Sequence, residues 1–405
     1  MAKDRQPHIG IFGRRNYGKS TLINKLAGQE IAIVSEVAGT TTDPVKKSFE
    51  ITGFGPVVLI DTAGFDDQGD LGQKRIEKTD KCIKLIDLAI LLISDNVIDE
   101  KELQIIQKFK DHDVPFIIVY SKSDLTTPID SIVAKVKALQ CADFLIFNKD
   151  EDITDLIKSI KTSIPESAYT NPSLLGDVVK HGDIVLLITP IDIEAPEGRL
   201  ILPQVQAIRD VIDNDAVCIV LKEREVDAFL MKTKIKPALV ITDSQVFLKA
   251  DASVPKDIPL TSFSIMLARF KGDFGSYLHG TPQLSKLEDG DRVLLLESCT
   301  HHVSCNDIGR SKIPRWISNF TGKHHEYDVV SGFDNLPKPI ESYAMVIQCG
   351  GCMISRKQLI NRLKPALDAG IPVTNYGMAI AYVLGIYNRA VAPFVRIEEN
   401  AEDYL

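Results

Sequence analysis

The sequence has no long apolar run, no recognisable leader and no excess of positive charge. No stretch of the 405-residue chain reaches the roughly 18 apolar residues that a membrane helix needs, so no membrane association is expected. The opening MAKDRQPHIG has no charged segment followed by an apolar one, so no signal peptide is expected. A net charge of −8 and the lack of a Lys/Arg run argue against nucleic-acid binding. These absences predict a cytoplasmic protein.

The cysteine pattern argues against disulfide bonds. The seven cysteines are an odd number in a long chain without an expected leader, which favours free thiols. Cys82, Cys141 and Cys218 lie in apolar or helical contexts and are expected in the core. The other four lie after residue 298, and this skew indicates metal binding in the C-terminal region.

What is present is a regular alternation of strands and helices. The apolar runs expected to form strands are His8–Phe12, Val57–Ile60, Leu88–Ile93, Phe116–Tyr120, Ile184–Ile188, Val217–Leu221, Leu239–Thr242, Arg292–Leu296, Ala344–Gln348 and Val373–Thr374. The segments expected to form helices are Ser20–Ala27, Gly72–Lys84, Glu100–His112, Ile129–Leu139, Pro203–Ile212, Glu225–Lys232, Gln358–Ala369 and Met378–Leu384. The alternation predicts an α/β protein with parallel sheets.

Two proline-containing passages, Ser163–Ser173 and Val254–Ser262, interrupt this alternation and predict linkers. We therefore expect three domains, at residues 1–168, 174–260 and 263–405. The middle domain carries no catalytic constellation, and a packing or dimer role for its apolar strands comes from a family resemblance and not from their pattern.

A phosphate-binding motif stands at the start of the first domain. Residues 13–20, GRRNYGKS, match G-x-x-x-x-G-K-[ST] after a strand and before a helix, which is the context that supports a P-loop. Its glycines let backbone N–H groups face phosphates. Lys19 is expected to reach the β- and γ-phosphates, and the Ser20 hydroxyl is expected to bind Mg²⁺.

Two later motifs, and a loop between the P-loop and the first of them, complete the predicted nucleotide site. In D-T-A-G, Asp61 can hold Mg²⁺ through water and Gly64 can sense the γ-phosphate. In S-K-S-D, the Asp124 carboxylate can accept the guanine N1 and N2 hydrogens while Lys122 packs on the ring, which favours GTP over ATP. Ser121 replaces the usual Asn and can still donate one hydrogen bond. Thr41 is expected to complete the Mg²⁺ shell when GTP is bound.

The C-terminal cysteines form a second constellation. Cys299 and His301 follow one predicted strand, and Cys349-Gly-Gly-Cys352 follows another. Turns at the carboxyl ends of parallel strands can converge at one sheet edge. Soft thiolate and imidazole ligands suit zinc or iron–sulfur. Three clear thiolates with one open position favour a [4Fe–4S] cluster, with His301 as a candidate fourth ligand and His302 and Cys305 in competition.

The P-loop run, with G-T-T-T-D and D-T-A-G, resembles the TrmE/Era branch of GTPases. That resemblance implies that Asn16 ligates a potassium ion in place of an arginine finger. Phe65 stands where other GTPases have the water-positioning Gln. An acidic residue that orients water would fall at Asp67, although Asp66 and Asp67 can equally be solvated loop charges.

The G domain followed by C-x-H and C-x-x-C resembles the HydF family, the maturation GTPases of [FeFe]-hydrogenase. The segments GDIVLLITPIDIEAPEGRLILPQVQAIRD and GIPVTNYGMAI support this over essentially the whole chain. The resemblance implies a homodimer that holds a diiron precursor beside its cluster. Two radical-SAM maturases would supply the precursor's ligands, and the hydrogenase would receive it. Gln348 stands where the family has a His, which leaves the fourth iron ligand open.

The residues expected to bind GTP or GDP with Mg²⁺ and K⁺ are Asn16, Tyr17, Gly18, Lys19, Ser20, Thr21, Asp61, Gly64, Lys122 and Asp124. Those expected to serve GTP hydrolysis are Lys19, Thr41 and Asp67, and those expected to bind the cluster are Cys299, His301, Cys349 and Cys352. Two alternatives remain: a ribosome- or tRNA-linked GTPase with a C-terminal zinc module, and a redox enzyme in which GTP hydrolysis drives electron transfer.

Overall fold

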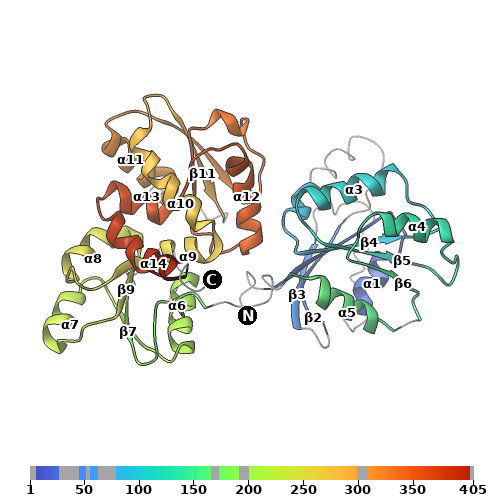
Figure 1. The fold of residues 1–405 in the computed structure, drawn as a ribbon, viewed down its shortest axis with the longest axis horizontal. Coiled ribbons are helices and arrows are strands. Elements are labelled where there is room, and N and C mark those ends of the chain that lie inside the picture. Colours follow the sequence, from blue (N-terminus) through green and yellow to red (C-terminus); the bar gives the residue numbers. More distant parts are fainter. Residues whose placement is uncertain are drawn as a thin grey trace. The chain divides into compact units, whose positions relative to one another are not determined.

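The computed structural model of the chain describes residues 6–26, 45–51, 55–62, 79–150, 152–165, 173–190, 200–298 and 308–401. The chain divides into two compact units, Met1–Asn171 and Pro172–Leu405 (Figure 1). In the described part of the chain, no helix combines the length and the apolar character needed to cross a lipid bilayer.

The first unit is built on a six-stranded sheet in the order β2-β3-β1-β4-β5-β6. Its strands are β1 His8–Gly13, β2 Val45–Ile51, β3 Gly55–Asp61, β4 Leu88–Ile93, β5 Phe116–Tyr120 and β6 Asp143–Ile146. All neighbours are parallel except β2 and β3. Every residue of β4 and β5 is buried, as expected for strands covered on both faces. The four strands predicted here are confirmed, whereas the edge strands β2 and β6 lack a long apolar run and were not predicted.

Helices cover both faces of this sheet (Figure 1). They are α1 Lys19–Leu26, α3 Glu100–Asp111, α4 Asp130–Ala138 and α5 Thr154–Ser163. α1 and α5 share one core with Ile9 and Ile11 of β1. The next residue, Phe12, points to the opposite face, where its ring meets Phe109 of α3 at 5.0 Å between centroids. Of the predicted helix 72–84, residues 79–83 are helical and the preceding part lies outside the described residues.

The second unit contains two four-stranded sheets in which all neighbouring strands are parallel. Their orders are β10-β9-β7-β8 and β12-β11-β13-β14. The strands are β7 Ile184–Ile188, β8 Val217–Leu221, β9 Leu239–Thr242, β10 Leu260–Ser262, β11 Arg292–Glu297, β12 Glu326–Ser331, β13 Met345–Gln348 and β14 Val373–Asn375. The two sheets thus have the same topology. In each, the first strand lies inside, the second lies at one edge, and the third and fourth follow on the other side.

One continuous core joins these two sheets, from Leu174 to Phe394. The α-helices around it are α6 Leu202–Asp213, α7 Val226–Thr233, α8 Phe247–Ser253, α9 Phe263–Lys271, α10 Phe274–Gly280, α11 Ile313–Thr321, α12 Arg356–Asp368, α13 Tyr376–Val383 and α14 Tyr387–Ala401. Arg389 of α14 donates to the Asp251 carboxylate at 2.6 Å and to the carbonyl of Pro255 at 2.6 Å. The last helix is thereby tied to α8 and to the segment that follows it.

Candidate functional site

The first site is the turn between β1 and α1, where the sequence predicts the P-loop. Gly13 has φ +152°, and a Cβ atom there would lie 3.0 Å from the Leu92 carbonyl oxygen, so glycine is required. Asn16, at φ 65°, and Gly18, at φ +86°, also have left-handed backbone. The turn ends at Lys19, where α1 begins, so the unbonded N–H groups of the first helical turn face back toward it.

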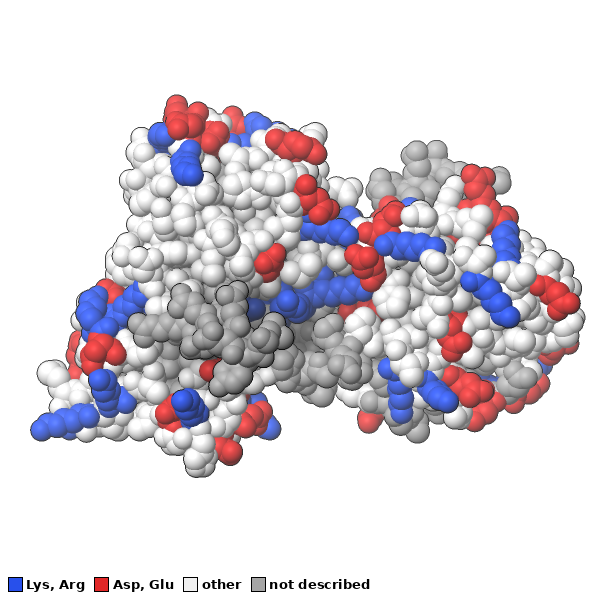
Figure 2. Space-filling view, viewed as in Figure 1, with Lys and Arg blue, Asp and Glu red and all other residues white. Residues whose placement is uncertain are grey.

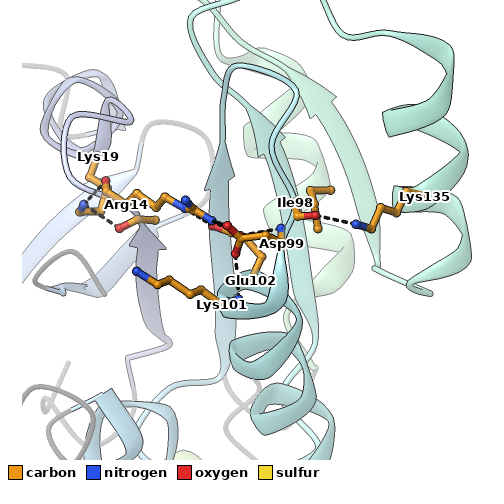
Figure 3. Close-up of polar contacts among 8 residues, drawn as sticks. Arg14, Lys19, Ile98, Asp99, Lys101, Glu102 and Lys135 are labelled. Carbon is orange, nitrogen blue, oxygen red and sulfur yellow. Dashed lines mark hydrogen bonds and ion pairs between the residues drawn. The ribbon is translucent and has the colours of Figure 1, made fainter. Parts of the chain in front are cut away.

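Lys19 is folded over this turn (Figure 3). Its Nζ atom donates to the carbonyl oxygen of Gly13 at 2.9 Å and to that of Arg14 at 2.8 Å. Ser20 and Thr21 follow in the first turn of α1 and are exposed. The predicted phosphate-binding lysine and Mg²⁺-binding serine are therefore consecutive residues at the amino end of one helix.

Arg14 anchors the turn to the start of α3 (Figure 3). Its guanidinium donates to both carboxylate oxygens of the fully buried Glu102, each at 2.6 Å, and pairs with Asp99 at 2.5 Å. The bond to Glu102 holds the pKa of Arg14 above its usual range, and the bond from Arg14 lowers the pKa of Asp99 to about 2. Glu102 also accepts the Asp99 N–H at 3.0 Å and caps α3. The P-loop is thus fixed to a helix that the motif does not include.

Asp61 is the last residue of β3 and lies opposite Ile11 of β1 in the parallel register. The next residue, Thr62, donates its hydroxyl to the Ile11 carbonyl at 2.7 Å. The D-T-A-G motif therefore begins beside the strand that leads into the P-loop. Its Gly64 lies outside the described residues, as do Thr41 and Asp67.

The S-K-S-D segment follows β5 at the same sheet edge. Ser121 is 1% exposed, and its Oγ lies 2.7 Å from the Tyr17 carbonyl and 3.1 Å from the Ile93 carbonyl. Ser121 thus bonds to the P-loop backbone, which differs from the expectation that its hydroxyl is available to the base. Lys122 has φ 58°, and Asp124, two residues later, is exposed. The hydroxyl group of Ser121 thus links the two nucleotide motifs.

On the visible face of the first unit, acidic and basic side chains are interspersed (Figure 2).

The second site lies at the carboxyl edge of the sheet β12-β11-β13-β14. β11 and β13 are parallel neighbours, with Leu296 opposite Gln348. The chain leaves β11 toward one side of the sheet and β13 toward the other, which makes their shared edge a switch point, where such sheets place ligands. Ser298, just after β11, and Cys349, just after β13, meet at this edge.

The Cys349 sulfur is surrounded by hydrogen-bond donors. Its Sγ accepts the backbone N–H of Ser298 at 3.1 Å and lies 3.0 Å from the Ser298 hydroxyl and 3.4 Å from Gln348 Nε2. Burial raises the pKa of the Cys349 thiol, and the bonds from Ser298 and the Gly351 N–H oppose that rise. Both Cys349 and Cys352 are partly exposed. The environment therefore combines a low-dielectric setting with N–H groups directed at sulfur.

Gln348, which stands where the family resemblance implies a His, is fully buried beside this thiol. Its Nε2 donates to the Ser298 hydroxyl at 3.0 Å, whereas its Oε1 has no hydrogen-bond partner among the described residues. Arg362 of α12 donates to the carbonyl oxygen of Glu297 at 2.9 Å, at the end of β11. Polar groups from two strands and one helix thus converge on the turn.

Among the described residues, no group of three or more His, Cys, Asp or Glu side chains could hold a metal ion. Cys349 and Cys352 lie in one turn, and Cys299 and His301 lie outside the described residues. Cys82 is buried, and burial raises the thiol pKa of Cys141, and that of Cys218 to about 11.

Three residues that no sequence pattern indicates bond to the turns of these sites or beside them: Arg14, Arg362 and Lys271. Arg14 stands at a variable position of the P-loop motif, so the motif gives no signal for it. Lys271 and Arg362 act on turns that are remote from them in the sequence, and no local pattern points to them.

Models of three known domain families match the chain. Residues 174–272 match the hydrogen maturase F dimerization domain, and residues 275–393 match the hydrogen maturase F tetramerization domain. Residues 8–122 match the 50S ribosome-binding GTPase family. The first unit is thus a P-loop GTPase domain, and further α/β domains follow it.

Two curated relatives each match less than half of this chain. The tRNA modification GTPase MnmE of Aliarcobacter butzleri is 31% identical over 195 residues, 47% of this chain and 39% of that protein. MnmE of Chromobacterium violaceum is 41% identical over 120 residues, 29% of this chain and 26% of that protein. The matches therefore span well under half of either relative.

Among solved structures, Era of Aquifex aeolicus bound to GDP.AlF4- is similar, with a TM-score of 0.35 and 19% identity, over 56% of this chain and 98% of that chain. The two hydrogen maturase F models cover more than half of the chain together, and the GTPase model covers residues 8–122 of the P-loop unit. The chain therefore belongs to the hydrogen maturase F family, HydF.

Proposed function

We propose that this chain is a GTP hydrolase coupled to an iron–sulfur scaffold, which assembles the diiron subcluster of [FeFe]-hydrogenase and passes it to that enzyme. The proposal rests on membership in the HydF family. For the nucleotide it is carried by the hydrogen bond from Ser121 to Tyr17, which joins the P-loop to the predicted guanine-binding segment. Two motifs held together in this way can bind the phosphates and the base of one nucleotide.

The phosphates of GTP are the natural partners of Lys19. In this proposal its ammonium group leaves the carbonyls of Gly13 and Arg14 for the β- and γ-phosphates, since charged oxygens are stronger acceptors. The hydroxyls of Ser20 and Thr41 bind Mg²⁺, and Asp61 reaches it through water.

Two further roles follow the likeness to the TrmE/Era branch. Asn16 binds a potassium ion that stands in for an arginine finger, and Asp67 orients the attacking water. Potassium stimulation of GTP hydrolysis, lost when Asn16 is replaced by Ala, tests the first role.

The turn that carries Cys349 and Cys352, called the thiol turn below, has the sulfur ligands and the N–H donors that suit an iron–sulfur cluster. Cys349 and Cys352 are separated by two glycines, and the Cys349 sulfur receives the kind of N–H bond that tunes sulfur ligands. Ser298, which makes that bond, directly precedes Cys299 in the sequence. We assign Cys299, Cys349 and Cys352 as thiolate ligands of a [4Fe–4S] cluster, with His301 as a candidate fourth. When bound, the cluster supplies one-electron chemistry and an iron with an exchangeable position.

Partners follow from the family. The dimerization and tetramerization domains support self-association, and we propose a homodimer as the working form. Radical-SAM maturases and the [FeFe]-hydrogenase are its proposed partners. GTP orders the switch loops and thereby controls docking of these partners.

The deciding experiment is anaerobic reconstitution of the full chain with iron and sulfide, followed by EPR of the reduced protein. A [4Fe–4S] signal and transfer of a diiron precursor to the hydrogenase are expected. Colourless protein that holds stoichiometric zinc would contradict the proposal. It would favour the tRNA-linked GTPase, which the likeness to MnmE supports as a second candidate.

Guanine selection has its own test in Asp124→Asn. Xanthine has an oxygen where guanine has its 2-amino group, and an Asn amide can donate to that oxygen. The variant is expected to lose GTP affinity by tens of fold, as for a hydrogen bond to a charged group, and to gain xanthosine triphosphate affinity. Asp130→Asn, in the first turn of α4, serves as the control. Unchanged GTP preference would remove Asp124 from the base site.

A further inference from the structure

Lys271 is the last residue of α9 and is 2% exposed. Its Nζ atom donates to the carbonyl oxygens of Gly351 at 3.1 Å, Cys352 at 3.3 Å and Ile354 at 2.9 Å. An ammonium group has three N–H donors, and here three carbonyls of one turn converge on them. That turn carries both described thiols of the second site.

The lysine sets the direction of the peptide groups in this turn. In a planar trans peptide the C=O and the following N–H point in opposite directions, and the described chain has no cis peptide bond. Because the carbonyls of Gly351 and Cys352 point toward Lys271, the N–H groups of Cys352 and Met353 point away from it. The Gly351 N–H already bonds with the Cys349 thiol. The contacts with Lys271 therefore leave the N–H groups of Cys352 and Met353 directed away from the ammonium group.

The turn itself has little freedom to adopt another path. Gly351 has φ +65°, and a Cβ atom there would lie 2.5 Å from Leu359 Cδ1, so a side chain is excluded on both counts. At Gly350 the nearest atom to an added Cβ would be Ser264 Oγ at 3.7 Å, which is ordinary contact. The two glycines between the thiols thus differ, and only the one whose carbonyl meets Lys271 is restricted.

Burial of an ammonium group is costly unless charge or dipoles compensate for it. The carbonyl dipoles supply part of this compensation. Negative charge on the sulfur atoms of the same turn would supply more, and thiolates that hold an iron–sulfur cluster carry such charge.

We propose that Lys271 positions the thiol turn and places a fixed positive charge against its backbone, which raises the reduction potential of the cluster that the thiolates of this turn hold. The charge effect rests on the proposed cluster, whereas the positioning of the turn does not. Lys271 is a positioning residue, since its own contacts are with the turn backbone.

The first arm of the test uses the full chain without iron, so that it does not depend on the cluster. Amide hydrogen exchange of residues 349–355 is compared between wild type and Lys271→Met. The variant is expected to exchange about tenfold faster or more in this turn, while β13 keeps its protection. Lys323→Met is the matched control, because Lys323 also donates to a backbone carbonyl, that of Leu287, at 2.9 Å and precedes β12 at the other sheet edge.

The second arm measures the midpoint potential of the reconstituted cluster. Lys271→Gln keeps two N–H donors and removes the charge, so its turn is expected to exchange more slowly than that of Lys271→Met while its potential becomes more negative. Lys271→Arg restores the charge and is expected to bring the potential back toward wild type. GTP hydrolysis is expected to be unchanged in all variants, and the fluorescence of Trp316 in α11 reports whether the second unit folds.

The two roles of Lys271 and the cluster assignment can fail independently in these experiments. Wild-type exchange in Lys271→Met would overturn the positioning role, and a wild-type potential in Lys271→Gln would overturn the charge role. If the wild-type chain takes up no iron while Lys271→Met still loosens the turn, the cluster assignment fails and the positioning role stands.

Discussion

The P-loop turn and the thiol turn are built alike, but their lysines differ. Each turn contains glycine and follows an inner strand at the carboxyl edge of its sheet, and in each a lysine donates to turn carbonyls. Lys19 belongs to the turn it contacts and is partly exposed, whereas Lys271 comes from α9 and is buried. A lysine within the turn can exchange carbonyls for phosphate without repacking. A buried lysine from another element can leave only if that element moves, which suits a ligand that stays bound.

Loss of Lys19 is expected to have the largest effect. Lys19→Ala removes the cation assigned to the β- and γ-phosphates and should lower the rate of GTP hydrolysis by about 10²-fold or more. Phosphate release assays measure it, with Lys25→Ala in the same helix as control. Iron uptake is expected to stay at the wild-type level, because the thiol turn belongs to a different sheet. Hydrolysis within twofold of wild type would refute the assignment.

Replacement of a cysteine in the thiol turn is expected to have the opposite effect, loss of the cluster with retained GTP hydrolysis. Cys349→Ala or Cys352→Ala is expected to abolish the EPR signal of the reduced cluster while GTP hydrolysis continues, because the two sites use different sheets. Cys218→Ser is the control, since burial keeps the Cys218 thiol protonated, with a pKa of about 11. Retained iron in both single variants would remove these thiols from the ligand set.

The anchor of the P-loop should matter for stability. Arg14→Ala leaves the fully buried Glu102 without its guanidinium partner, which is expected to cost about 3 kcal/mol in unfolding free energy. Urea unfolding followed by circular dichroism detects this loss. The single tryptophan, Trp316, lies in the second unit, so its fluorescence transition should not move. Arg14→Met combined with Glu102→Leu is expected to regain stability, and equal loss in the pair would count against the ion pair as the cause.

The smallest effect is expected at the link between the nucleotide motifs. Ser121→Ala removes the hydrogen bond to the Tyr17 carbonyl, worth about 1 kcal/mol or about fivefold in GTP affinity. Fluorescent-nucleotide titration measures it, and Ser123→Ala in the same segment is the control. A loss of affinity in the control alone would show that the link has no role in binding.

The strands of both units show which elements can be predicted from a local pattern of apolar residues. Buried runs such as β4 Leu88–Ile93 and β7 Ile184–Ile188 were predicted to the residue, because strands covered on both faces are apolar throughout. β12 Glu326–Ser331 was missed, since it is an edge strand with only one buried residue. The short helices α9 and α10 were missed too, and α9 carries Lys271.

The sequence by itself determined the P-loop, the Cys349–Cys352 turn and the α/β alternation, because each depends on residues close together in the chain. Only the tertiary structure decided which side chains form hydrogen bonds with the backbone and side chains of those turns. Arg14 meets Glu102 across 88 positions, Ser121 meets Tyr17 across 104, and Lys271 meets Gly351 across 80. Such contacts form only when particular strands and helices pack in one register, and no local periodicity encodes which side chains then face each other.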